Sequence, residues 1–117
     1  MSDQGFWLEE FPVAITVTDA SGTILTMNAR SRTSFEKEGG GALVGTNVFD
    51  CHPEPARSKT VELYADRKAN HYTVRKDGQK KVIHQIPWYR GGAFAGFVEI
   101  SIPIPDDLPH FDRDQKT

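Results

Sequence analysis

Two strand-like segments near the start of the chain, joined by a short turn sequence, constrain the fold more than any other feature. In residues 13–18, β-branched apolar residues alternate with smaller or polar ones, and residues 24–27 form a second such run. Between them lies Asp-Ala-Ser-Gly-Thr, residues 19–23. A Ser-Gly turn between two β-rich runs is typical of a β-hairpin.

The last third of the chain repeats this pattern twice. Asp77-Gly78 and Gly91-Gly92 separate three segments with strand character, residues 70–76, 80–89 and 93–104. Asp-Gly between alternating runs is the strongest short-range signal of a hairpin. We therefore expect three consecutive antiparallel strands here.

Helical patterns occupy the middle of the chain. Residues 29–38 predict a polar helix that ends at the three glycines 39–41, which we expect to form a flexible loop. Residues 54–68 predict a longer helix with a proline in its first turn. Two strands, short helices and three strands together indicate an α+β fold with an antiparallel sheet.

Composition narrows the class of protein. The chain has 117 residues and 38% hydrophobic residues, which suits one compact domain without a separate effector domain. A formal net charge of −2 argues against nucleic-acid binding, and no apolar run is long enough to predict a membrane span. Cys51 is the sole cysteine, and residues 1–5 do not resemble a signal peptide. We expect a cytoplasmic protein without a four-cysteine metal site.

The sequence predicts a cap segment at residues 1–12, a domain at residues 13–104 and a flexible polar tail at residues 105–117. The cap segment concentrates apolar side chains and is compatible with an amphipathic helix. Its apolar residues either complete the core or form a dimer or partner surface; they are Phe6, Trp7, Leu8 and Phe11.

Residues 11–29, from Phe11 to Ala29, resemble the opening of a PAS domain, in which a hairpin feeds a helix. Residues 43–53 resemble the central PAS segment. A narrower similarity is to bacterial PAS sensor proteins with a Gly-x-Asn-x-x-Asp-Cys-His-Pro segment, here residues 45–53, and it extends to residues 85–99. The resemblance covers about residues 11–104. It implies five antiparallel strands, with the first two between later ones, and short helices on one face.

The triplet Asp50-Cys51-His52 carries the most reactive side chains. A cysteine beside a histidine suits a thiol of lowered pKa, a pair of metal ligands or a ligand-attachment site. The structural alternative is that Asp50 caps the following helix, Cys51 packs as a small apolar residue and His52 bonds to the backbone.

His71 and His84 lie on facing strands and are expected to approach one another. Because strand side chains alternate, either His84 or Gln85 faces the helices, where a polar group would anchor a ligand. Tyr72 and Trp88 are candidates for aromatic walls of the same pocket, although both also suit a core. The candidate ligand site thus comprises Cys51, His52, Tyr72, His84, Gln85 and Trp88.

The resemblance also bears on cofactors, and none is assigned. Haem-binding PAS relatives take an axial histidine from the long helix, and residues 54–68 contain none. Flavin-binding relatives need a cysteine after the asparagine that corresponds to Asn47, where this chain has Val48. Haem and flavin are therefore not expected, and no residue pattern predicts a metal site or a catalytic group.

The resulting hypothesis is a PAS sensor that acts as a homodimer. A small molecule, or a redox change at Cys51, would shift the packing of helices on the sheet and alter the surface offered to a signalling partner. The alternative is a docking module without a ligand that uses the aromatic residues of segment 1–12. That the chain is a small enzyme is the least favoured of the three hypotheses.

Overall fold

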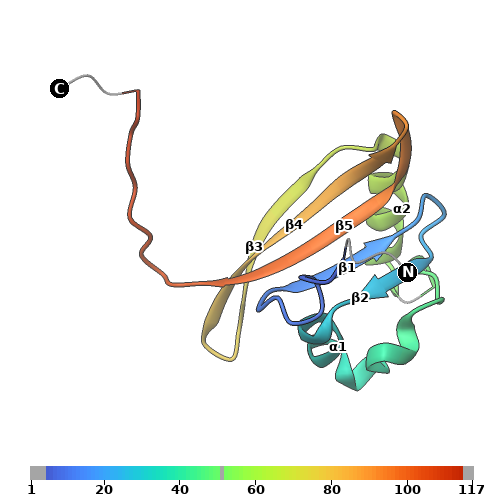
Figure 1. Cartoon of the computed structure of the whole chain (residues 1–117), viewed down its shortest axis with the longest axis horizontal. Coiled ribbons are helices and arrows are strands. Elements are labelled where there is room, and N and C mark those ends of the chain that lie inside the picture. Colours follow the sequence, from blue (N-terminus) through green and yellow to red (C-terminus); the bar gives the residue numbers. More distant parts are fainter. Residues whose placement is uncertain (1–4, 51, 115–117) are drawn as a thin grey trace.

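The computed structural model describes residues 5–50 and 52–114. Two strands are followed by short helices and then by three strands, as the sequence predicts (Figure 1). The elements are β1 (Ala14–Thr18), β2 (Ile24–Met27), α1 (Ala29–Ser34), the 3-10 helices η1 (Glu36–Glu38) and η2 (Gly40–Leu43), α2 (Ala56–Asp66), β3 (Asn70–Lys76), β4 (Gln79–Arg90) and β5 (Ala93–Ile104).

The five strands form one antiparallel sheet in the order β2-β1-β5-β4-β3. The expectation that the first two strands lie between later ones was wrong, because β2 is an edge strand. The reason is that tight turns keep β3, β4 and β5 consecutive. β1 then pairs with the free edge of β5, and β2 pairs with the far side of β1.

Both α-helices lie on the same face of the sheet, as predicted. The hydroxyl of Ser31 in α1 bonds that of Thr16, and the hydroxyl of Tyr64 in α2 bonds that of Thr18. Thr16 and Thr18 are two residues apart on β1, so their side chains point to the same face. Figure 1 shows α1 near the β2 edge and α2 near the opposite end of the strands.

The turn sequences explain the hairpins. The Asp19 carboxylate accepts hydrogen bonds from the backbone amides of Ser21 and Thr23, each at 2.9 Å, which closes the β1–β2 turn. Asp77 and Gly78 both have positive φ, 53° and 78°, as a two-residue turn of the primed type requires.

The glycine run differs from its prediction. Gly40–Leu43 is a 3-10 helix rather than a flexible loop, and Gly40 is buried. The amide of Gly40 donates to the carbonyl of Phe35 at 2.9 Å, and φ at Gly40 is 54°. Positive φ at glycine lets the chain turn back beneath α1, so these glycines make a tight connection.

The two predicted helices are shorter than expected. The segment 29–38 divides into α1 and η1, and the segment 54–68 contains α2 at Ala56–Asp66. Arg67 ends α2 in the left-handed conformation with φ 55°, and its amide donates to Leu63. No side-chain cap begins α2, so the alternative in which Asp50 caps this helix was wrong.

Asn28 connects the sheet, the first helix and the preceding segment. Its side chain is 1% exposed. Its Oδ1 accepts from the amides of Ile15 at 3.0 Å and Ser31 at 3.1 Å. Its Nδ2 donates to the carbonyls of Val13 at 2.7 Å and Phe11 at 3.4 Å. One buried amide therefore caps α1 and fixes the start of β1 against it.

The predicted helical cap is not a helix. The part that the structure describes, from Gly5, forms turns in which Leu8 bonds to Gly5 and Phe11 bonds to Leu8. These are bonds between residues three apart, and the segment is too short to offset the cost of helix nucleation. The ion pair between Glu9 and Arg32 ties it to α1.

Residues 105–114 have no regular secondary structure and run away from the sheet (Figure 1). Arg75 holds the beginning of this tail through an ion pair with Asp106 at 2.6 Å. No helix within the described residues combines the length and the apolar character that a membrane span requires.

Asn28→Ala tests the importance of the buried amide. We expect the free energy of unfolding to fall by about 3 kcal/mol, because the helix cap is lost and several buried backbone groups lose their partner. Urea denaturation measures this change. Asn70→Ala removes the same amide at an exposed position and should cost less than about 1 kcal/mol. Equal losses in the two variants would contradict a special role for Asn28.

Candidate ligand-binding cavity

A cavity of about 540 Å³ lies between the sheet and the helices. This volume is within the range of small-molecule sites. Its apolar wall comes from strands, helices and the connection between them: Ile24, Met27, Phe35, Leu43, Val48, Leu63 and Phe97. Its polar lining consists of Thr16, Thr18, Glu38, His52, Thr60, Tyr64, Gln85 and Glu99.

The cavity is lined by the same sheet face on which the helices lie. Thr16 and Glu99 are directly paired across β1 and β5, and Glu99 is paired with Gln85 across β5 and β4. Gln85 is in turn paired with Asn70 on β3. Directly opposed residues project to the same face, so these four side chains form a polar row across four strands.

Hydrogen bonds connect most of this polar row. Asn70 Nδ2 donates to Gln85 Oε1 at 2.8 Å, and Gln85 Nε2 donates to Glu99 Oε2 at 3.0 Å. Within residues 5–50 and 52–114, no hydrogen bond reaches the other Glu99 oxygen, Oε1. The hydrogen-bonded part of the row therefore ends at Glu99, a carboxylate in a largely apolar cavity with acceptor capacity to spare.

Tyr64 closes one end of the cavity. Its hydroxyl lies 2.5 Å from Thr18 Oγ1, which also accepts the amide of Phe97 at 3.2 Å. The ring packs edge-on against Phe49, with 5.0 Å between centroids. Burial raises the pKa of the Tyr64 hydroxyl above its usual value, the hydrogen bond with Thr18 opposes this rise, and the charge of Glu99 adds to it. Tyr64 is thus a neutral phenol at physiological pH.

A more open groove of about 780 Å³ adjoins the cavity along α2 and β3. The two share Phe35, His52, Thr60, Leu63, Gln85 and Glu99. Tyr72 lines the groove, where burial raises the pKa of its hydroxyl and the negative charge of Glu99 raises it further. The groove and the cavity are therefore neighbouring spaces that share one boundary.

The structure brings three of the predicted ligand-site residues together. His52 and Gln85 line both the cavity and the groove, and Tyr72 lines the groove. Of the two consecutive residues on β4, Gln85 faces the helices. His84 therefore faces the opposite side, where its Nδ1 lies 2.8 Å from Nδ1 of His71. The expected approach of these two histidines is confirmed.

Trp88 lines neither the cavity nor the groove, and its indole is hydrogen-bonded to the backbone instead. Its Nε1 donates to the carbonyl of Thr18 at 2.9 Å. Gly96, opposite Trp88 on β5, has φ 144°, and a Cβ there would lie 2.0 Å from that same carbonyl. Cys51 lies outside the described residues.

Sequence reasoning missed Glu99 and Tyr64. Glu99 is a single acidic residue within an otherwise uncharged strand, β5, and this was a signal that could have found it. Tyr64 lies on the long predicted helix, and no pattern in the sequence indicates its bond to Thr18. Among residues 5–50 and 52–114, no group of three or more potential metal ligands gathers.

Comparisons with known proteins agree with the architecture. No protein-family model and no curated protein matches the sequence. Solved structures do match. The C-terminal domain of a protein from Streptococcus mutans has 20% identity and a TM-score of 0.68, over 85% of this chain and 81% of that one. The PAS domain of BvgS from Bordetella pertussis has 21% identity and a TM-score of 0.64, over 86% and 83%.

A third match is the Aer2 receptor from Vibrio cholerae, described as a dual PAS-haem oxygen sensor, with 16% identity and a TM-score of 0.56 over 80% of this chain and 95% of that one. Together with the strand order and the placement of the helices, these likenesses identify the fold. This chain has the PAS fold, which it shares with domains of sensor kinases and receptors.

Proposed function

We propose that this chain is a sensory module that takes up a small molecule in the cavity and passes the signal to a second protein chain. The observation that carries the proposal is the Glu99 carboxylate, which stands in an apolar cavity with one oxygen open to a ligand. The likeness to sensor proteins supports the same reading. The proposal includes no catalytic step.

The charge of the lining defines the class of ligand. Glu38 and Glu99 line the cavity, and no lysine or arginine is among its described lining residues. A carboxylate of the ligand would be repelled, whereas an N–H donor would pair with Glu99. We therefore propose a largely apolar molecule that is neutral or cationic and carries an N–H group.

Helix α2 is the element that a ligand would reposition. Of its residues, 56–66, all described by the structure, Tyr64 alone is buried. Thr60, Leu63 and Tyr64 face the cavity. A ligand would add contacts between this face and the sheet, favouring a state in which α2 lies closer to β4 and β5.

A docking module without a ligand is the second candidate. It is favoured by the exposure of Phe6 at 83%, Trp7 at 51% and Phe11 at 41%. The rings of Trp7 and Phe11 pack edge to face, 5.5 Å apart, which makes a preformed aromatic surface. This surface also suits the homodimer that the sequence predicts.

Filling the cavity should prevent uptake of a ligand. Thr60 lies where cavity and groove meet, so Thr60→Phe should remove a small molecule retained by the wild-type protein in native mass spectrometry after purification from its host. Val61→Phe is the matched control, because Val61 is exposed and lines neither space. A wild-type protein without any bound molecule would favour the docking module. Equal retention of the molecule by Thr60→Phe and the wild type would show that it does not bind in this cavity.

The charge preference can be tested with three compounds that share an indole ring and differ in charge. In thermal-shift titrations we expect tryptamine, a cation, to stabilise the protein more than indole, and indole-3-acetate least. A ligand at a hundredfold excess over its dissociation constant adds about 2.7 kcal/mol. Glu99→Gln should abolish the difference between the cation and the anion, while Glu36→Gln, outside both spaces, should preserve it. A preference for the anion in the wild type would contradict the proposed class.

The aromatic surface makes a separate prediction. If it forms the dimer, Trp7→Ala should weaken self-association at least about tenfold, which is about 1.4 kcal/mol, because buried tryptophans dominate such interfaces. Analytical ultracentrifugation measures the constant. Phe111→Ala is the control, since Phe111 is also exposed but lies on the tail. Unchanged self-association of Trp7→Ala would exclude this surface.

A further inference from the structure

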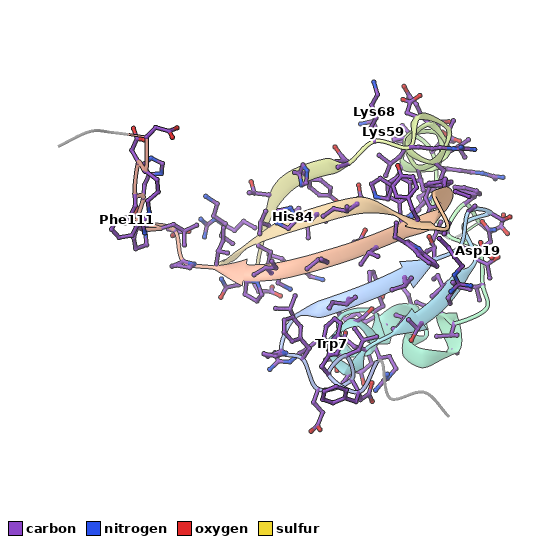
Figure 2. All side chains as sticks on the ribbon, turned by 45° about the horizontal axis from the view of Figure 1, so that its top comes forward. Trp7, Asp19, Lys59, Lys68, His84 and Phe111 are labelled. Carbon is purple, nitrogen blue, oxygen red and sulfur yellow. The ribbon has the colours of Figure 1, made fainter. Side chains whose placement is uncertain are left out.

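A pair of histidines stands on the sheet face opposite the cavity. His71 and His84 are directly paired across β3 and β4, and their Nδ1 atoms are 2.8 Å apart. Their rings meet edge-on, with 5.0 Å between centroids. His84 lies midway along the sheet, well away from Phe111 on the tail (Figure 2).

The separation of the two nitrogens suits a metal ion. Metal–nitrogen bonds of about 2.0–2.1 Å place two ligands about 2.9 Å apart when they meet at a right angle, and about 3.3 Å apart in a tetrahedron. The observed 2.8 Å, which is a hydrogen-bond distance between the two rings, is also close to the right-angle value. Square-planar and tetragonal nitrogen sites are typical of Cu²⁺ and Ni²⁺.

The backbone around the pair is already fixed. The β3–β4 ladder is continuous from Asn70, opposite Gln85, to Lys76, opposite Gln79, so both histidines lie within it. On the adjacent rung, Asn70 and Gln85 are joined by a hydrogen bond of 2.8 Å on the other face. Both Nδ1 lone pairs would meet at one ion after the rings rotate and the bridging proton moves from the donor's Nδ1 to its Nε2.

The neighbours of the pair on this face carry no charge. Alternation and register put Thr73, Val82, Ile86 and Ile100 on the same face, next to the pair on β3, β4 and β5. These four residues are uncharged, so none repels a cation. None supplies a carboxylate either, so water would occupy the remaining coordination positions.

We propose that His71 and His84 form a two-histidine site for one divalent transition-metal ion, with Cu²⁺ preferred over Ni²⁺ and Ni²⁺ over Zn²⁺. The sequence predicted no metal site, because a pair of histidines thirteen residues apart in the chain has no recognisable spacing. This site is separate from the cavity and does not depend on the proposed ligand. A bound ion would join β3 to β4 through their side chains.

The test uses the full chain without an affinity tag, in a Cys51→Ser background so that the thiol neither binds nor reduces copper. Titration with Cu²⁺ in a non-coordinating buffer at pH 7.5 should give one ion per chain, and electron paramagnetic resonance should show two nitrogen ligands. Affinity should fall as the pH is lowered, because protons compete with the ion for both ring nitrogens.

His71→Asn and His84→Asn should each lower the affinity for Cu²⁺ at least about tenfold while circular dichroism stays unchanged. His110→Asn, on the tail, is the matched control and should bind like the parent. The proposal is overturned if no Cu²⁺ binds at millimolar concentration, if the control loses binding as much as the pair, or if one ion requires two chains.

Discussion

The buried side-chain amide of Asn28 is the interaction on which the rest of the structure depends. It satisfies the amide that begins α1 and the backbone groups of β1 and of the segment before it. Because both its donors and its acceptor are used, hydrogen bonds as well as apolar packing determine the position of α1 relative to β1. The first wall of the cavity, from Thr16 on β1 to Phe35 after α1, is placed by this one residue.

The second requirement is the register of the sheet. Thr16, Glu99, Gln85 and Asn70 meet because four strands align them on one face. A shift of one residue in any strand would send its member of the row to the other face. Gly96 helps to hold this register, since only a residue without a side chain allows β5 to approach the carbonyl of Thr18 so closely. The site is therefore a property of strand pairing more than of any local motif.

Local chemistry explains which parts of the fold were predictable. Asp19, Asp77 and Gly78 determine turns through bonds and φ angles within a few residues, so the hairpins could be read from the sequence. The sequence could not show which face of β4 points to the helices, because apolar residues lie on both of its faces and their alternation does not distinguish the two. Which of His84 and Gln85 faced the helices thus depended on pairing with β5. The glycine run was misread because its role depends on contact with α1, a tertiary feature.

The two faces of the sheet are linked through adjacent rungs of one ladder. Asn70 and Gln85 form the rung on the cavity side, and His71 with His84 forms the next rung on the outer side. A ligand that draws Gln85 toward α2 would change the twist of β4 at the position where His84 must hold its geometry. An ion held by the two histidines would resist that change. Since coupling between binding sites is reciprocal, each occupant would alter the affinity of the other by the same factor.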